Sequence, residues 1–181
     1  MNLDEQIIES YLNGDENAIA VLVNRYAGHI YNFVRQSVRD SEVAEDLTQE
    51  VFVKAWKNIK KFDLDKKFKP WLFQIARNAI IDYLRKKKDV SFSELEDVYD
   101  KDFDVVDDSS DIEGLVDKKA AENKVKEAIE KIPEKYRSVI SLYYQEGFNL
   151  REISEISGKP LDTVKSQHRR ALQWLKKLLS I

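Results

Sequence analysis

Hydroxyl and cationic side chains gather near the C-terminus, in a stretch with helical periodicity. An apolar stripe with spacings of three and four is formed by Val164, Ala171, Leu172 and Leu175. The other side chains in the first half of this stretch include Thr163, Lys165, Ser166, Arg169 and Arg170. Such side chains donate hydrogen bonds to phosphates and to base edges. The pattern therefore predicts a DNA-contacting helix over 160–179, whereas His168, four residues after Val164, is expected to pack at the edge of the core.

The preceding residues complete a helix-turn-helix pattern. A short helix is expected over 149–157, because Asn149 and Glu152 have the spacing of a capping box. Gly158 supplies the left-handed residue that ends it. In this motif the second helix enters the major groove with its N-terminal residues against the bases.

An acidic stretch over 89–117 is the other candidate for chemistry. The first three spacings of a calcium-binding loop are met by Asp100, Asp102 and Asp104. Position six is Val105 rather than Gly, and position twelve is Asp111 rather than Glu, so calcium binding is disfavoured. With two His, no Cys and no Gly-rich phosphate loop, a metal-dependent phosphohydrolase is also disfavoured. We expect no catalytic residues, no metal site and no cofactor.

Charge is strongly segregated along the chain, although the net charge is only -3. Residues 1–50 hold 10 acidic and 3 basic side chains, and residues 51–88 hold 3 and 12. Residues 89–117 hold 12 and 1, and residues 118–181 hold 8 and 14. Two basic blocks separated by an acidic one indicate two surfaces that contact a polyanion.

The elements that carry these residues are predicted to be helices, because only 5 Gly and 3 Pro interrupt 181 residues. Apolar residues have helical spacing from Ile19 to Val34, behind a candidate cap at Asp15. The same spacing recurs from Ser41 to Ile59 and from Pro70 to Tyr83.

The periodicity stops at Asp89 and resumes near Lys118. We therefore predict an all-α protein with two small helical domains, residues 1–88 and 118–181, joined by an acidic flexible linker over 89–117. The N-terminus has neither a basic nor an apolar leader segment, and no run of 18 apolar residues occurs. The sequence thus favours a soluble, cytoplasmic protein that does not insert into the membrane.

Three segments resemble a known family. AEDLTQEVFVKAW is similar to the polymerase-binding helix of sigma region 2, and KFKPWLFQIARNAIIDYLRKKK to its -10 recognition segment. IPEKYRSVISLYYQEGFNLREISEISGKPLDTVKSQHRRAL is similar to sigma region 4. The chain thus resembles an extracytoplasmic-function (ECF) sigma factor of the sigma-70 family over nearly its whole length apart from the linker.

The resemblance implies binding to core RNA polymerase, capture of the single-stranded -10 element by the first domain and reading of the duplex -35 element by the second. It also makes an anti-sigma factor a possible partner. The linker would thread the polymerase cleft. Gln167 stands where the family often has Arg, and Lys66 and Lys67 stand where it often has small residues, so the promoter sequence is not implied.

Three sets of contact residues follow from the resemblance. Core-polymerase contacts are Asp46, Gln49, Glu50, Phe52 and Trp56. Contacts with the -10 element are Lys54, Phe62, Asp63, Phe68, Gln74, Arg77, Asn78, Asp82 and Arg85. Contacts with the -35 element are Arg151, Thr163, Lys165, Ser166, Arg169 and Arg170.

The aromatic residues in and beside these sets have two interpretations. Exposed rings at Phe62 and Phe68 would stack on unpaired bases, whereas Trp71, in a helical stripe, is expected in the core. Phe52 and Trp56 either anchor the polymerase or complete the domain core.

A stand-alone helix-turn-helix regulator is the alternative function. Such a protein would act as a dimer on a symmetric operator without polymerase.

Overall fold

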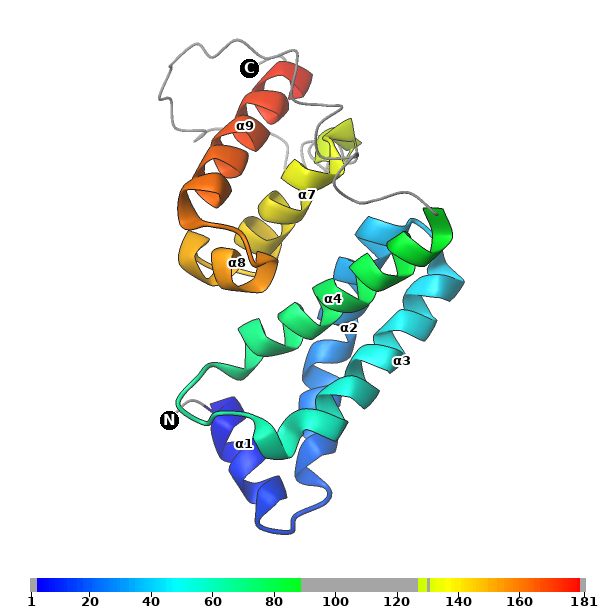
Figure 1. Ribbon diagram of the computed structural model, residues 1–181, viewed down its shortest axis with the longest axis vertical. Coiled ribbons are helices and arrows are strands. Elements are labelled where there is room, and N and C mark those ends of the chain that lie inside the picture. Colours follow the sequence, from blue (N-terminus) through cyan, green and yellow to red (C-terminus); the bar gives the residue numbers. More distant parts are fainter. Residues whose placement is uncertain (1–2, 89–126, 130, 180–181) are drawn as a thin grey trace, which may run out of the picture.

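The computed structural model describes residues 3–88, 127–129 and 131–179, and every element that these residues form is helical (Figure 1). The N-terminal unit contains α1 (Leu3–Leu12), α2 (Ala18–Val38), α3 (Ser41–Asn58), the 3₁₀ turn η1 (Ile59–Lys61) and α4 (Phe68–Lys88). The C-terminal unit contains α7 (Glu134–Ile140), the π-helical η2 (Ser141–Gln145), α8 (Leu150–Ser157) and α9 (Leu161–Leu179). The all-α prediction is confirmed, and the acidic stretch over 89–117 lies outside the described residues.

Local signals at the helix ends explain where most elements start and stop. Arg39 adopts a left-handed conformation with φ of 58°, which ends α2. Asp40 then caps α3, because its side chain accepts the backbone N–H groups of Glu42 and Val43 at 3.0 and 3.3 Å. The predicted Asp15 cap is wrong. The Asp15 carboxylate accepts the N–H of Asn17 in a turn, and α2 begins at Ala18, with Asn17 at the cap position.

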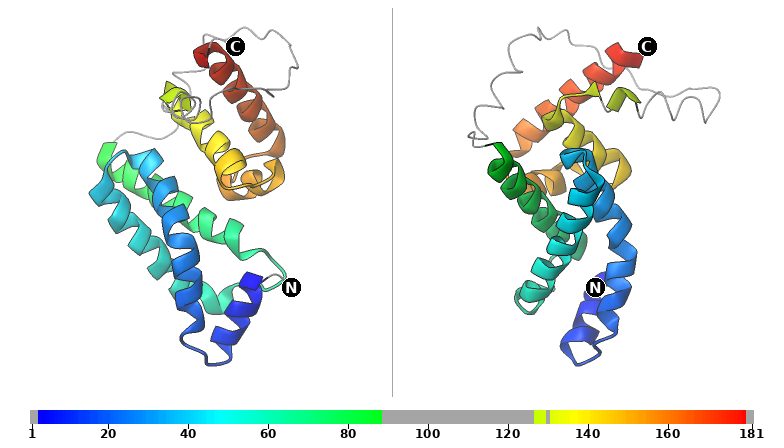
Figure 2. Two further views of the ribbon diagram at one scale, coloured as in Figure 1. Left: turned by 180° about the vertical axis from the view of Figure 1, so that it is seen from behind. Right: turned by 90° about the vertical axis from the view of Figure 1, so that its right-hand side faces the viewer.

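The N-terminal unit is built around three long helices. α2, α3 and α4 pack along one another, and the short α1 lies against α2 and α4 at one end (Figures 1 and 2). Its fully buried side chains include Leu22, Ile30, Val51, Leu72 and Phe73. Each such side chain contributes about 1.5–3 kcal/mol by leaving water, so this core holds the helices in register.

The C-terminal unit has the predicted helix-turn-helix. The Asn149 side chain accepts the N–H groups of Arg151 and Glu152 at 3.0 Å, and Glu152 accepts the Asn149 N–H at 3.0 Å. This reciprocal pair is the expected capping box, and Gly158, with φ of 64°, ends α8 as expected.

The two units are in contact through α4 and α8, which lie side by side in the views of Figures 1 and 2. One continuous cluster of buried residues runs from Phe73 of α4 to Phe148, Ile153 and Ile156 of the C-terminal unit. A second, smaller cluster lies between α7 and α9. The helix-turn-helix is therefore docked on the N-terminal unit rather than held apart from it.

Candidate nucleic-acid and polymerase interfaces

The candidate -35 residues lie on the two helices of the helix-turn-helix, five on α9 and Arg151 on α8. Val164 and Ala171 are fully buried, which turns Thr163, Lys165 and Arg169 outward to solvent. Ser166 and Arg170 are half-buried beside them, and Arg151 is exposed on α8. The hydroxyl and cationic groups that the sequence pattern predicted for duplex reading are therefore at least partly accessible, and their role in -35 recognition stays a prediction.

His168 packs as expected at the edge of the core. Its ring centroid lies 4.6 Å from that of Tyr143, and its ring stacks on Tyr144 at 6.0 Å. Burial lowers the pKa of His168 below its ordinary value. The neutral imidazole is therefore the form that this packing favours.

This packing predicts acid sensitivity. Because its folded-state pKa lies below the unfolded value, His168 takes up a proton on unfolding, so stability is lost as the pH falls through about 6.5. Between about pH 7.5 and 5.5, the melting temperature should fall by about 2 °C more for the unaltered protein than for His168→Phe, whose ring cannot titrate. Equal pH profiles for both proteins, measured by circular dichroism, would contradict the assignment.

The polar -10 candidates on α4 form a helical face that α8 partly covers. Gln74, Asn78, Asp82 and Arg85 are exposed, and Arg77 is half-buried. The Gln74 amide donates to the Glu155 carbonyl oxygen of α8 at 3.4 Å. A guanidinium nitrogen of Arg77 lies 3.8 Å from where a Cβ at Gly158 would be. The first half of this face therefore lies under the helix-turn-helix.

The expected exposed rings at Phe62 and Phe68 are a wrong prediction. The two residues are only 7% and 2% exposed, and their rings meet edge to face at 5.9 Å. Trp71 is half-buried, with its ring centroid 5.0 Å from that of Phe62. These rings complete the core around the start of α4, because aromatic side chains at helical spacing gain most by leaving water.

The remaining -10 candidates are polar groups at the surface. Asp63 is exposed, and its carboxylate accepts the N–H of Asp65 at 3.1 Å, which orders the loop before α4. Lys54 is half-buried and pairs with Glu50 at 2.7 Å across one turn of α3.

The candidate polymerase contacts lie on the outer face of α3. Asp46, Gln49 and Glu50 are exposed, and Val53, 50% exposed, continues the same face one turn later. An exposed apolar side chain next to acidic ones fits a protein interface. The helical spacing of Val53 from Asp46 and Glu50 could have identified Val53 from the sequence as a residue of this face. Phe52 is partly buried against the core, and the ring of the half-buried Trp56 lies 5.6 Å from that of Tyr11.

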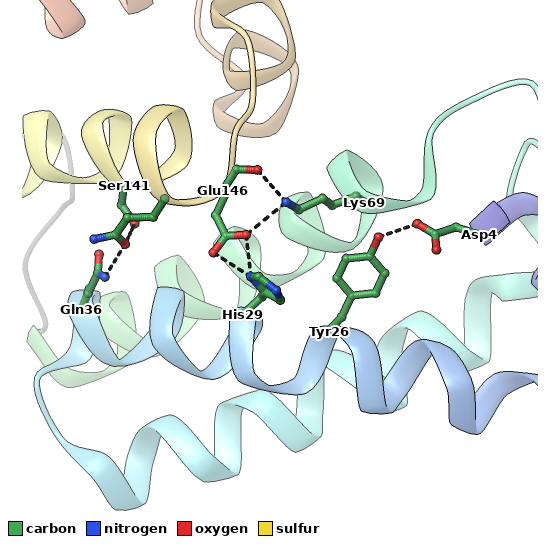
Figure 3. Close-up of polar contacts among 8 residues, drawn as sticks. Asp4, Tyr26, His29, Gln36, Lys69, Ser141 and Glu146 are labelled. Carbon is green, nitrogen blue, oxygen red and sulfur yellow. Dashed lines mark hydrogen bonds and ion pairs between the residues drawn. The ribbon is translucent and has the colours of Figure 1, made fainter. Parts of the chain in front are cut away.

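Ion pairs and amide contacts connect the two units (Figure 3). The Glu146 carboxylate lies 3.0 Å from His29 Nδ1 and 3.2 Å from Lys69 Nζ, and that ammonium also donates to the Glu146 carbonyl oxygen at 2.6 Å. Beside them the Gln36 amide of α2 donates to Gln145 Oε1 at 2.8 Å. Figure 3 shows these groups facing one another across the boundary.

Three further contacts lie at the boundary, near the starts of α4 and α8. Lys67 Nζ pairs with Glu152 at 2.6 Å, and this hydrogen bond raises the pKa of Lys67. Burial acts to raise the pKa of Glu152, but the bonds from Lys67 and the Asn149 N–H outweigh it, and the pKa is lowered. The Phe148 ring meets Phe73 edge to face at 5.0 Å, and Lys69 Nζ lies 4.9 Å from the Phe148 ring centroid.

Sequence reasoning missed these boundary residues. The sequence feature that could have indicated this contact is complementary charge, with lysines within 66–69 and acids at Glu146, Glu152 and Glu155. That signal does not show which charges meet, because surface charges of both signs are common on helical proteins.

A four-helix unit followed by a helix-turn-helix unit with exposed cationic side chains fits a DNA-binding protein of transcription. Comparison with known proteins narrows this class: residues 22–90 match Sigma-70 region 2, and residues 122–175 match Sigma-70, region 4. The chain belongs to the extracytoplasmic-function sigma factors of the sigma-70 family, and it is a transcription initiation factor. The alternative of a stand-alone dimeric regulator is not supported.

Relatives match the chain over almost all of its length. The ECF RNA polymerase sigma factor SigW of Bacillus subtilis (strain 168) is 36% identical over 179 residues, 95% of this chain and 94% of the relative. SigM of the same organism is 37% identical over 158 residues, 84% of this chain and 90% of the relative.

Solved structures agree on the fold. The sigma factor RpoE, in complex with the anti-sigma factor NepR from Bartonella quintana, superposes with a TM-score of 0.66 at 25% identity, covering 91% of this chain and 98% of that one. CnrH, in complex with the cytosolic domain of CnrY, gives a TM-score of 0.69 at 23% identity, covering 99% and 98%.

In the part of the chain that the structure describes, no helix is long and apolar enough to cross a membrane. The same residues contain no group of three or more His, Cys, Asp or Glu placed to hold a metal ion. The Asp100 to Asp111 stretch lies outside them.

Proposed function

We propose that this sigma factor docks on core RNA polymerase through the outer face of α3, reads the -35 duplex through α9 and holds the unpaired -10 strand along α4. The observation that carries the proposal is the exposure of Thr163, Lys165 and Arg169 on the second helix of an intact helix-turn-helix. Hydroxyl and cationic groups there match the acceptors of the major groove and the phosphates beside it.

The contact between α4 and α8 adds a step to this function. Gln74 donates to the backbone of α8, and Arg77 lies beside Gly158. A DNA strand that uses these side chains needs the space that α8 occupies. The two units therefore separate before the -10 strand binds, and region 2 and region 4 then reach their two promoter elements independently. The acidic stretch over 89–117 is the proposed linker between them.

The partners follow from the same proposal. The chain acts in the cytoplasm as the DNA-binding subunit of a holoenzyme, with no cofactor and no catalytic chemistry of its own. RpoE, similar to this chain, forms a complex with an anti-sigma factor, which supports an anti-sigma partner here.

Holoenzyme assembly provides the direct test. The purified protein is mixed with bacterial core polymerase, separated by size exclusion, and assayed by run-off transcription on a library of upstream fragments. One-to-one co-elution with new promoter-specific transcripts is expected. Co-elution without new transcripts, or tight binding to a symmetric duplex without polymerase, would contradict the proposal.

Reversing the charge of the α3 face should impair this assembly. Asp46→Lys with Glu50→Lys removes two acids beside Val53 and is expected to weaken core-polymerase binding about tenfold, because complementary charge steers association. The control is Glu9→Lys with Glu16→Lys, which changes net charge equally at exposed positions elsewhere on the same unit. Fluorescence titration with labelled core polymerase measures both, and equal losses in both pairs would contradict an α3 interface.

A further inference from the structure

A buried carboxylate on α1 bonds to the first residue of α4. Glu5 is only 4% exposed, and its Oε1 accepts the backbone N–H of Phe68 at 2.9 Å in a buried hydrogen bond. A buried carboxylate is stable only where donors compensate the loss of water. The start of a helix offers both free N–H groups and the positive end of the helix dipole.

α4 has no adequate cap within its own sequence. Lys67 precedes its first residue, and a lysine ammonium donates hydrogen bonds but accepts none. The first turn contains no acidic side chain, and Pro70 in that turn has no N–H. The acceptor for Phe68 therefore comes from Glu5 of α1, 63 residues earlier in the chain.

The neighbouring acid fixes α1 in the position that this contact requires. Asp4 is buried and accepts hydrogen bonds from the Tyr26 phenol and the Arg25 guanidinium of α2 (Figure 3 shows Asp4 and Tyr26). Burial, and then the bond to Asp4, raise the pKa of Tyr26, so the phenol stays protonated and donates. The Tyr26 ring also meets the Phe68 ring edge to face at 5.8 Å. α1 and α2 thus hold Phe68 by its backbone and by its ring.

Phe68 joins two parts of the proposed -10 site. It follows the loop over 63–67, and it begins the helix that presents Gln74 and Arg77. We propose that Glu5 is a positioning residue for -10 recognition, which sets the first turn of α4 and the end of this loop without contacting DNA. This inference rests on the proposed role of α4.

The test compares Glu5→Ala, which removes the acceptor, with Glu5→Gln, whose amide oxygen retains it. Each variant is assembled into holoenzyme, and promoter opening is followed by a fluorescent base analogue in the -10 element. Loss of a helix cap is expected to reduce opening about fivefold for Glu5→Ala. Glu5→Gln should recover most of that loss, and holoenzyme assembly and -35 duplex binding should be unchanged for both.

Ile8→Ala is the matched control. Ile8 is a fully buried residue on the same helix, so its replacement loosens α1 without removing an acceptor. The positioning role is overturned if promoter opening falls equally in Ile8→Ala and Glu5→Ala, in proportion to their loss of melting temperature. It is also overturned if Glu5→Gln is as impaired in opening as Glu5→Ala. If Glu5→Ala does not fold, amide hydrogen exchange at Phe68 in the unaltered protein decides: protection supports the cap, and fast exchange overturns it.

The variant Arg77→Ala distinguishes a failure of the positioning role of Glu5 from a failure of the proposed role of α4 in -10 recognition. Normal opening with Arg77→Ala would overturn the role of α4 itself. Impaired opening with Arg77→Ala but normal opening with Glu5→Ala would overturn only the role of Glu5.

Discussion

Replacing Phe148 with alanine is expected to lower the free energy of unfolding by about 3 kcal/mol and to separate the two units. Phe148 is 4% exposed and lies at the boundary, against Phe73 and beneath the Lys69 ammonium. Its removal leaves a cavity between α4 and the C-terminal unit. The ion pair of Lys67 with Glu152 contributes much less, because the Lys67 side chain is largely exposed and solvent screens the pair.

Small-angle X-ray scattering and thermal unfolding test this prediction. The radius of gyration of Phe148→Ala should exceed that of the unaltered protein, and its unfolding should split into two transitions as the units lose their shared core. Tyr144→Ala is the control, because it removes an exposed ring four residues away. An unchanged radius of gyration and a single unshifted transition in Phe148→Ala would show that the ring does not hold the units together.

The double variant Lys165→Ala with Arg169→Ala is expected to weaken holoenzyme binding to a -35 duplex by about 10- to 100-fold. Both side chains are exposed on the outward face of α9. If they contact phosphates, the salt dependence of binding falls by about two counterions. If one reads a base, its loss also relaxes the preferred sequence at one position.

The control for this variant is Lys176→Ala with Lys177→Ala, which removes the same charge from the other end of α9. Fluorescence anisotropy over a series of salt concentrations compares the two pairs on one duplex. Core-polymerase binding should be unaffected in both. Identical losses and identical salt slopes would show that α9 attracts DNA through net charge alone.

Features with local causes were predictable from the sequence. The Asn149 and Glu152 capping box, the Gly158 stop and the Pro70 position in the first turn of α4 depend on residues within a few positions of one another. α2, α3 and α9 were likewise found from apolar spacing. α1 was missed, because two of its three buried residues are the acids Asp4 and Glu5.

Features that depend on distant partners were not predictable. Nothing near Phe62 and Phe68 in the sequence shows that Tyr26 and α1 cover their side of the unit. The pattern of apolar residues also does not distinguish an aromatic ring that stacks on bases from one that packs in the core. The docking of α8 on α4 is of the same kind, because its contacts join residues 75 or more positions apart.

The number of residues in η2 sets the direction, around the helix axis, in which the chain continues after α7 and η2. Its turn is closed by the Glu146 N–H and the Ser141 carbonyl oxygen, five residues apart and 3.1 Å away, so it holds one residue more than an α-helical turn. Deleting one residue here would rotate everything that follows by about 100° and carry Glu146 away from Lys69. Tyr143 and Tyr144 lie on this turn and contact His168, so insertions and deletions within the segment would also move these rings and undock the helix-turn-helix.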